Sequence, residues 1–274
     1  MRLAFDGPLD WEALLGYFAA RAIPGVEEVS PAAYRRTTAL GVLELSPGGE
    51  DHLVLRLDGA EPTAEVARRA RRIMSLDLDL EEACLHLARD PVVGALVEAR
   101  PGIRVPGTWD PFETGIRAIV GQQVTVAGAS TLTGRLVERL GAPAGDARYA
   151  FPSPETVAEG DLDGVGLTRA RAGAIRGFAR AVAESAIRLD GSAGLDELVE
   201  SIVAVEGLGE WTAQYIGLRM CEPDAFPATD LGLRRAVARL GSTTPLAELA
   251  ERWRPWRALA ATHLWLAPPT NDGQ

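Results

Sequence analysis

The sequence predicts an α+β protein in which a small N-terminal domain, an antiparallel sheet with helices, precedes a larger all-helical region. Alternating apolar and polar residues occupy 34–46 and 52–58, as in half-buried strands, and turn-like residues at 47–49 separate them. From about residue 109 onward this alternation fades and helical periodicity replaces it. The length of 274 residues accommodates one large domain or two to three small ones.

The helices follow in order along the chain. The first is expected after Pro8 and Asp10, where apolar residues repeat at helical spacing: Trp11, Leu14, Leu15, Phe18 and Ala22. A second is expected over 61–74, with a proline in its first turn. Further stretches with helical periodicity or length are 111–121, 124–140, 154–160, 169–187, 194–204, 210–221, 231–240, 245–251 and 255–266. We expect 268–274, PPTNDGQ, to be a frayed tail.

Composition excludes several classes of protein. No uninterrupted apolar run of about 18 residues is present, so we expect no membrane span. The first residues lack the basic and apolar regions of a secretory signal. Cys84 and Cys221 lie far apart and form no metal-ligand cluster. We therefore expect a cytoplasmic protein.

The charge is acidic and uneven. The net charge of −10 weighs against a nucleic-acid partner, because DNA-binding proteins usually carry a basic surface. Residues 1–100 hold 17 acidic residues against 11 arginines, a net of −6, and the remaining chain is closer to neutral. Arginines cluster in that remaining part, although a solvated helix face explains each cluster equally well: Arg169, Arg171, Arg176 and Arg180; Arg234, Arg235 and Arg239; Arg252, Arg254 and Arg257.

All 28 basic residues are arginine, and the sequence contains no lysine. No lysine ε-amine is therefore available to form a Schiff base, which excludes a lysine-based lyase.

The segment 205–230, VEGLGEWTAQYIGLRMCEPDAFPATD, says most about function. Gly207, Leu208 and Gly209 form a turn between two helical patterns. Two glycines at this spacing let a helical hairpin bend tightly and bring backbone N–H groups close to a ligand. Such a hairpin suits a phosphate of the DNA backbone, which it binds without any demand on base sequence.

Two aromatic residues and one acid follow the turn. Trp211 and Tyr215 are one helical turn apart and share a helix face, as residues of a core stripe also do. Asp230 follows the Phe226-Pro227 step and precedes the helical run LGLRRAVARL. Taken alone, such an aspartate is most simply the N-cap of the next helix.

The order of hairpin, Trp-Thr-Ala and Phe-Pro-x-x-Asp resembles the helix-hairpin-helix, Gly/Pro…Asp signature of base-excision DNA glycosylases. Within that superfamily it looks most like the alkylbase enzymes of the 3-methyladenine DNA glycosylase II type. The segments LGYFAARAIPGVEEV and ARPGIRVPG resemble the small sheet domain that precedes the catalytic helices in those enzymes, so the resemblance covers essentially the whole chain. It implies an α/β domain over 1–100 and a helix-hairpin-helix glycosylase region over 101–274, with the active-site cleft between two helical subdomains.

The resemblance implies a monofunctional DNA glycosylase that removes alkylated purines, such as 3-methyladenine and 7-methylguanine, and leaves an abasic site. Asp230 would be the catalytic carboxylate, and a helix N-terminus favours its charged form. It would stabilise the positive charge that develops on the deoxyribose, and would orient or deprotonate the attacking water. Superfamily members that also cut the strand carry a lysine where this chain has Trp211, so no lysine-based lyase activity is expected.

The base pocket implied by the resemblance consists of Trp211, Tyr215, Trp265 and Tyr17. Alkylation at a ring nitrogen makes a base cationic, and an electron-rich aromatic cleft favours such a base through cation–π and stacking contacts. For Tyr17, burial on an amphipathic helix is an equally good account.

The DNA contacts implied by the resemblance come from the hairpin residues Gly207, Leu208, Gly209 and Thr212. Gln122 and Gln123, in IVGQQVT, would fill the gap left by the extruded base. Members of the family use an apolar side chain at the second of these positions. The alternative for the two glutamines is a polar helix-capping pair without a DNA role.

The resemblance further implies a monovalent cation on hairpin carbonyls of Val203, Val205 and Leu208. No catalytic metal and no cofactor are expected, because the histidines are dispersed along the chain: His52, His86 and His263.

Two other functions remain open. One is a non-enzymatic helix-hairpin-helix DNA-binding protein, in which Asp230 is only a cap. The other is a glycosylase for neutral lesions such as hypoxanthine or uracil. A pure binding module needs the hairpin but not the joint presence of Asp230, Trp211, Tyr215 and Trp265. The expected partner is double-stranded DNA with alkylated bases, bound by a monomeric, nucleoid-associated bacterial protein.

Overall fold

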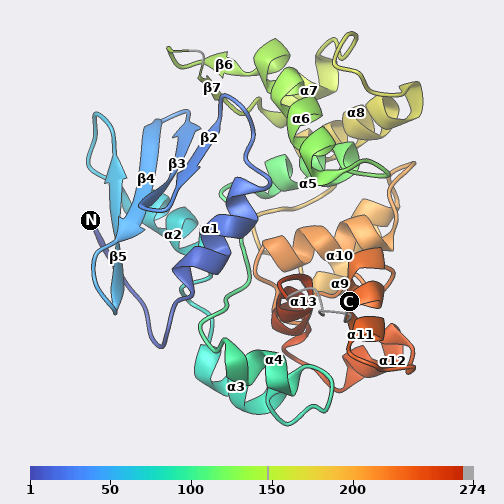
Figure 1. Ribbon diagram of the computed structural model, residues 1–274. Helices are drawn as coiled ribbons and strands as arrows, with labels where there is room; N and C mark the ends of the chain where they lie inside the picture. The colour runs from blue at the N-terminus through green and yellow to red at the C-terminus, as the bar shows by residue number, and fades with distance from the viewer. Residues whose placement is uncertain (147, 268–274) are drawn as a thin grey trace, which may run out of the picture.

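The computed structural model describes residues 1–146 and 148–267, so the expected tail at 268–274 lies outside the described residues. Its N-terminal part is a five-stranded antiparallel sheet in the order β1-β5-β4-β3-β2 (Figure 1). The strands are β1 (Arg2–Ala4), β2 (Glu27–Ser30), β3 (Ala33–Thr38), β4 (Gly41–Pro47) and β5 (His52–Leu57). The sheet with its helices, followed by a helical region, confirms the predicted α+β class.

Strands were correctly predicted over 34–46 and 52–58, but the first of these stretches was not divided into its two strands. The alternating stretch 34–46 is two strands, β3 and β4, which pair with Tyr34 opposite Leu45 and turn at residues 39–40. The edge strands β1 and β2 were not predicted, because stretches this short carry too little periodicity.

Two helices cover one face of the sheet. Helix α1 (Trp11–Ala19) begins at Asp10, whose carboxylate accepts a hydrogen bond from the backbone N–H of Ala13 at 3.0 Å. Helix α2 (Ala64–Ile73) is capped in the same way by Thr63. Apolar side chains of both helices share one core with Leu43, Leu45, Leu53 and Leu55 of the sheet.

The helices predicted from residue 111 onward are all present, and two short helices and a two-stranded ribbon that were not predicted accompany them. The elements are α3 (Leu80–Leu87), α4 (Gly94–Ala99), α5 (Pro111–Val120), α6 (Val126–Leu140), β6 (Ala142–Pro143), β7 (Tyr149–Ala150), α7 (Pro154–Glu159), α8 (Arg169–Ala183), α9 (Leu195–Val203), α10 (Glu210–Arg219), α11 (Leu231–Arg239), α12 (Leu246–Glu251) and α13 (Arg257–Trp265). None of these helices is both long and apolar enough to cross a membrane.

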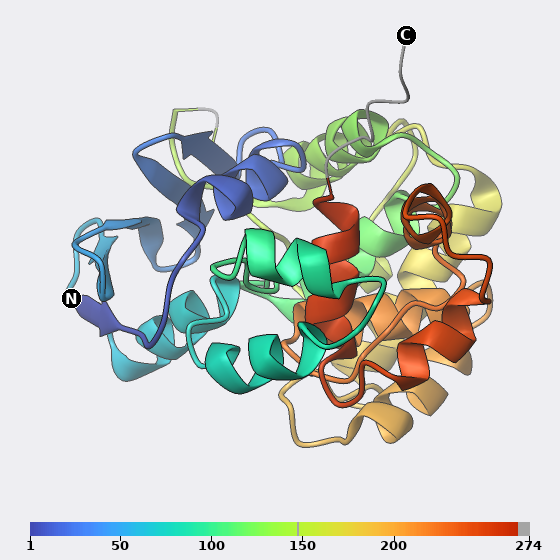
Figure 2. The ribbon, with the colours of Figure 1, turned by 60° about the horizontal axis from the view of Figure 1, so that its bottom comes forward.

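The helices build two hydrophobic cores, and α10 lies between them. Ala213 and Ile216 of α10 pack into a core with α5 to α9, whereas Leu218 packs into a core with α11 to α13. Helices α3 and α4 share the second core, and Figure 2 shows them beside α13. The domain boundary predicted at residue 100 stays a prediction, because α3 and α4, which precede it, pack into the same core as α11 to α13.

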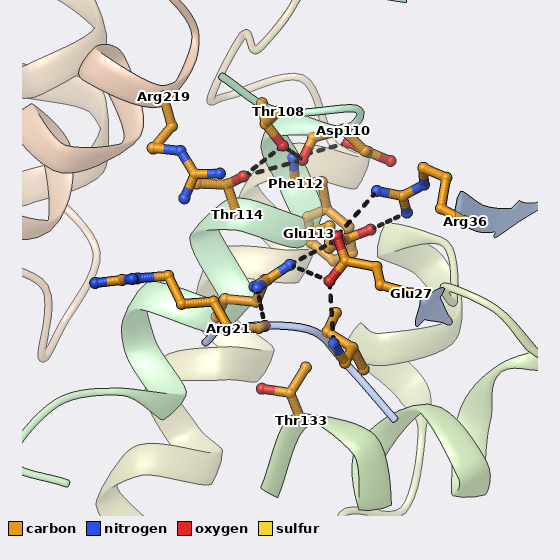
Figure 3. A network of polar contacts seen from close by, with 12 residues as sticks. Arg21, Glu27, Arg36, Thr108, Asp110, Phe112, Glu113, Thr114, Thr133 and Arg219 are labelled. Carbon is orange, nitrogen blue, oxygen red and sulfur yellow. Dashed lines mark hydrogen bonds and ion pairs between the residues drawn. The ribbon is translucent and has the colours of Figure 1, made fainter. Parts of the chain in front are cut away.

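A buried cluster of charges joins the sheet to α5 (Figure 3). Arg36 of β3 pairs with Glu113 of α5 at 2.6 Å, and Arg117 of α5 pairs with Glu27 of β2 at 2.9 Å. Arg117 also contacts Glu113 at 3.2 Å, and the Tyr34 hydroxyl donates to Glu27 at 2.7 Å. Two guanidinium groups thus balance two carboxylates, as burial demands.

The position of Glu27 in this cluster has a consequence for acid stability. Burial alone raises the pKa of Glu27, but the charges of Arg117 and Arg36 outweigh it and lower the pKa below its ordinary value. The folded state therefore loses this contribution to stability as the pH falls through the lowered pKa.

We predict that Glu113→Gln lowers the free energy of unfolding at pH 7 by about 3–5 kcal/mol, because Arg36 and Arg117 stay buried with too little negative charge. Urea denaturation followed by circular dichroism measures this. The control is Glu197→Gln, which breaks an exposed pair with Arg188 and should cost less than about 1 kcal/mol. Equal effects of the two variants would show that the buried cluster does not hold the sheet to α5.

Candidate active site

A cavity of about 310 Å³ opens where α1, α5, α6, α10 and α13 meet. Its size lies at the lower end of small-molecule pockets, which span roughly 300–1,000 Å³. All five residues predicted for catalysis and base binding line it, and they share the wall with residues of the loop before α6. The lining residues are Tyr17, Arg21, Arg117, Ala118, Gly121, Val124, Thr125, Val126, Ala129, Ser130, Thr133, Trp211, Tyr215, Asp230 and Trp265.

The Asp230 carboxylate is held by donors from three helices. It caps α11 by accepting the Leu233 N–H at 2.8 Å, so the capping role is present. The indole N–H of Trp211 in α10 donates to its other oxygen at 3.0 Å, and that of Trp265 in α13 donates at 3.1 Å. A helix cap alone does not need two indole donors, so this carboxylate is fixed in orientation inside the cavity.

The loop before Asp230 is anchored on α10. The buried Phe226 fills the core beside Trp253, and its backbone N–H donates to the Gln214 side chain at 2.9 Å. The Asp230 N–H then closes a turn onto the carbonyl of Pro227 at 2.8 Å. The Phe-Pro step therefore positions the acid relative to α10.

The aromatic side chains form one wall. Trp211 and Tyr215 stack with ring centroids 5.3 Å apart and planes 8° apart. Trp265 meets Tyr215 edge-on, with centroids 6.1 Å apart. The helical spacing of Trp211 and Tyr215 thus places both rings on the cavity wall.

Tyr17 reaches the same wall from α1 and meets Tyr215 hydroxyl to hydroxyl at 3.0 Å. The buried guanidinium of Arg219 donates to both hydroxyls, at 3.2 Å to Tyr17 and 3.0 Å to Tyr215. Burial alone raises the pKa of Tyr215, but the charges of Arg219 and Arg21 outweigh it and lower the pKa to about 8. Burial raises the pKa of Tyr17, so Tyr215 gives up the first proton of the pair.

The arginines that line this cavity, Arg21 and Arg117, were not predicted from the sequence. Arg21 lies with its Cζ 3.8 Å from the centroid of the Tyr17 ring, and Arg117 belongs to the buried charge cluster. The sequence spacing could have indicated Arg219 and Arg21. Arg219 follows Tyr215 by four residues on one face of α10, and Arg21 follows Tyr17 by four residues, in the turn after α1.

The hairpin between α9 and α10 directly precedes the helix that carries Trp211. Gly207 has φ +84°, a conformation that favours glycine, and a Cβ there would meet Ala174 at 3.2 Å. Gly209 is extended, and a Cβ there would meet nothing within 4 Å. The first N–H groups of α10 lack helical partners and are suited to an anion.

Two predicted DNA contacts are not available as side chains. Leu208 is 7% exposed, and its N–H donates to the Val205 carbonyl at 3.1 Å. Thr212 is 2% exposed and meets the Gln122 amide at 3.5 Å. Exposed glutamates, Glu206 and Glu210, flank the turn and oppose a phosphate.

The two glutamines differ in their surroundings. Gln122 is half-buried against Thr212, and its carbonyl accepts from the Arg171 guanidinium. Gln123 is exposed, and its backbone φ is +58°. Its side chain makes no hydrogen bond within the described residues. Of the two side chains, that of Gln123 is the more exposed.

No group of three or more His, Cys, Asp or Glu side chains that could hold a metal ion occurs within residues 1–146 and 148–267. The carbonyls proposed for a monovalent cation, those of Val203, Val205 and Leu208, lie at the C-terminal end of α9 and in the turn after it. The negative end of the helix dipole and free carbonyl lone pairs suit such a cation.

Two family models match the chain. The AlkA N-terminal domain matches residues 1–110, and the HhH-GPD superfamily of base excision DNA repair proteins matches residues 116–257. A Mycobacterium tuberculosis protein named "Probable bifunctional transcriptional activator/DNA repair enzyme AlkA" is 38% identical over 99% of this chain, which spans 58% of that protein's length. DNA-3-methyladenine glycosylase 2 of Escherichia coli is 35% identical over 96% of this chain and 95% of its own.

Solved structures share the fold. A 3-methyladenine DNA glycosylase from Archaeoglobus fulgidus superposes with a TM-score of 0.83 at 24% identity over 97% of each chain. An 8-oxoguanine glycosylase/lyase from Clostridium acetobutylicum, in complex with double-stranded DNA, gives 0.76 at 19% identity over 96% of this chain and 98% of its own.

We predict that one phenol of the native protein ionises with a midpoint near pH 8, seen as absorbance at 295 nm, and that Tyr215→Phe removes this step. The unfolded chain keeps this proton to about pH 10, so ionisation of Tyr215 favours the folded state between the two values. Tyr149→Phe serves as the control and should keep the step. If no phenol ionises below about pH 9, the arginines do not act on Tyr215 as described.

Proposed function

We propose that this chain, which belongs to the HhH-GPD superfamily of base excision DNA repair proteins, is a monofunctional DNA glycosylase that hydrolyses the N-glycosidic bond of alkylated purines. One observation carries the proposal: Asp230 is fixed by two indole donors in a cavity with an aromatic wall. The name of the Escherichia coli relative, DNA-3-methyladenine glycosylase 2, supports a glycosylase for alkylated bases, and the name of the Mycobacterium tuberculosis relative supports a role in DNA repair.

Asp230 would act through its charge. Breaking the bond between C1′ and the base nitrogen leaves positive charge on the deoxyribose, as in glycoside hydrolysis. A carboxylate held in one orientation stabilises that charge without reorganising at the moment of reaction. The same carboxylate would orient the water that attacks C1′, and the products would be the free base and an abasic site.

The aromatic wall would receive the extruded base. A purine that leaves the duplex loses stacking and pairing worth a few kcal/mol, and rings such as Trp211, Tyr215 and Trp265 restore part of the stacking. The exposed Gln123 would occupy the vacated position in the duplex.

The hairpin would hold the DNA backbone through main-chain N–H groups at the start of α10, with Gly209 allowing close approach. The side chains of Leu208 and Thr212 would support the turn from inside. A monovalent cation at the carbonyls of Val203, Val205 and Leu208 would add positive charge beside the phosphate.

We propose that the enzyme has no lyase activity, because the sequence carries Trp211 after the hairpin and no lysine. We also propose that it acts as a monomer on duplex DNA in the cytoplasm, associated with the nucleoid. A non-enzymatic DNA-binding protein is disfavoured, since binding alone gives no reason for two indole donors on Asp230.

We predict that Asp230→Asn reduces release of methylated purines from duplex DNA by at least about a hundredfold, because the charge is removed. Asparagine remains a good N-cap, so α11 should stay folded. Released bases are separated by chromatography, and the products are tested for strand cuts. DNA affinity and thermal stability are the controls. Near-normal release by this variant would leave Asp230 with the capping role only.

We predict that Gly209→Ser weakens binding to damaged and undamaged duplex equally, by about tenfold. Serine is favoured at a helix N-cap, so the fold is kept, but its hydroxyl takes up N–H groups of α10 that DNA would need. Fluorescence anisotropy with the two duplexes measures this, and thermal stability is the control. Weakened binding of damaged DNA alone would show that the hairpin reads the lesion rather than phosphate.

A further inference from the structure

Arg171, in the first turn of α8, holds the loop that carries Gln123. Its guanidinium donates to the backbone carbonyl of Gln122. That carbonyl belongs to the planar peptide unit between Gln122 and Gln123, so the hydrogen bond limits the rotation of this unit that sets φ of Gln123. Gln123 has φ +58°, a conformation that is uncommon for residues other than glycine. Arg171 therefore fixes the backbone from which the exposed Gln123 side chain extends.

The same loop is also tied to the hairpin. The side-chain amide of Gln122 lies 3.5 Å from the hydroxyl of Thr212, in the first turn of α10 after the hairpin. A Cβ on Gly207 of the hairpin would meet Ala174 of α8 at 3.2 Å. Arg171 precedes Ala174 by three residues and is its neighbour on the surface of α8. One side of α8 thus supports the hairpin and, one turn earlier, the loop of Gln123.

Stability alone does not account for an arginine at position 171. Among the described residues, no carboxylate lies within ion-pair distance of the Arg171 guanidinium, and its Nε is buried without an acceptor. A buried N–H without a partner loses hydration that the fold does not replace. The N-terminal turn of a helix also disfavours a positive charge. The buried Arg117, by contrast, is paired with Glu27 and Glu113.

We propose that Arg171 is a positioning residue for extrusion of the base, and that it acts by holding the peptide between Gln122 and Gln123. This inference rests on the proposed glycosylase function, in which Gln123 occupies the vacated position in the duplex. A side chain whose backbone is fixed in advance loses less conformational freedom when it is inserted. More of its contact energy then offsets the cost of unpairing and unstacking the base.

The test compares single-turnover release of 7-methylguanine from two duplexes, corrected for spontaneous loss. The lesion lies opposite cytosine in one duplex and opposite a tetrahydrofuran abasic-site analogue in the other, where no base pair has to be broken. Arg171→Met keeps the length of the side chain but removes its donors. It should slow release opposite cytosine by about tenfold more than release opposite the analogue. Arg180→Met removes an exposed arginine of the same helix and should leave the ratio of the two rates unchanged.

A double-mutant cycle with Gln123→Ala distinguishes positioning from a direct role. If Arg171 acts through Gln123, adding Arg171→Met to Gln123→Ala should slow release opposite cytosine by less than about a further twofold. A merely structural role would slow release from both duplexes equally, in either background. Arg171→Lys keeps the charge but loses the planar donors, so its ratio should lie between those of wild type and Arg171→Met.

The outcomes separate this inference from the proposed function. An unchanged ratio with Arg171→Met, or an undiminished effect of it in the Gln123→Ala background, would overturn the assignment of Arg171 while the glycosylase function stands. The same ratio change with Arg180→Met would also overturn it, because overall charge would then be the cause. If the wild type released the base from neither duplex, both proposals would fall. Circular dichroism checks the fold, and if Arg171→Met does not fold, a wild-type ratio with Arg171→Lys would overturn the assignment.

Discussion

The hydrogen bonds that three helices donate to the Asp230 carboxylate are the interaction on which the architecture of the cavity depends. Its two oxygens accept from Trp211 of α10, from Trp265 of α13 and from the N-terminus of α11. Hydrogen bonds to an ionised carboxylate are strong, and the geometry of these three fixes α10, α11 and α13 relative to one another. Helix α10 lies between the two helical cores and packs into each, so it can carry Trp211 to the carboxylate and Tyr215 to the aromatic wall.

The N-terminal domain contributes to the same site rather than serving as a separate body. Tyr17 and Arg21 enter the cavity from α1 and the residues that follow it, and Arg219 joins Tyr17 to Tyr215. The buried charge cluster holds this edge of the sheet against α5. The acidic N-terminal half therefore brings arginines to the cavity, although its overall charge suggests no role in binding DNA.

Much of this was accessible from the sequence, and the remainder had physical reasons to be hidden. The helices after residue 111 were predicted because each carries enough turns to show a period, whereas β1, β2, α3 and α4 are short or weakly patterned. Local motifs singled out Asp230, Trp211 and Tyr215, and the family resemblance added Trp265 and Tyr17. The structure brings all five into one cavity. Contacts between distant segments, such as Arg36 with Glu113, cannot be deduced from one sequence. The burial of Leu208 and Thr212 followed from packing that their position in the motif does not reveal.

In the proposed reaction, Asp230 stabilises positive charge on a deoxyribose. The most direct measurement compares the affinity of the protein for two duplexes that differ at one abasic-site analogue. One analogue is a pyrrolidine, which is positively charged in the sugar ring, and the other is the neutral tetrahydrofuran of the same shape. Mimics of a transition state bind at least about a hundredfold tighter than the substrate. We expect a preference of this size for the pyrrolidine duplex over the tetrahydrofuran duplex. Equal affinity for the two duplexes would contradict this role of Asp230, because the carboxylate would then not act on the sugar.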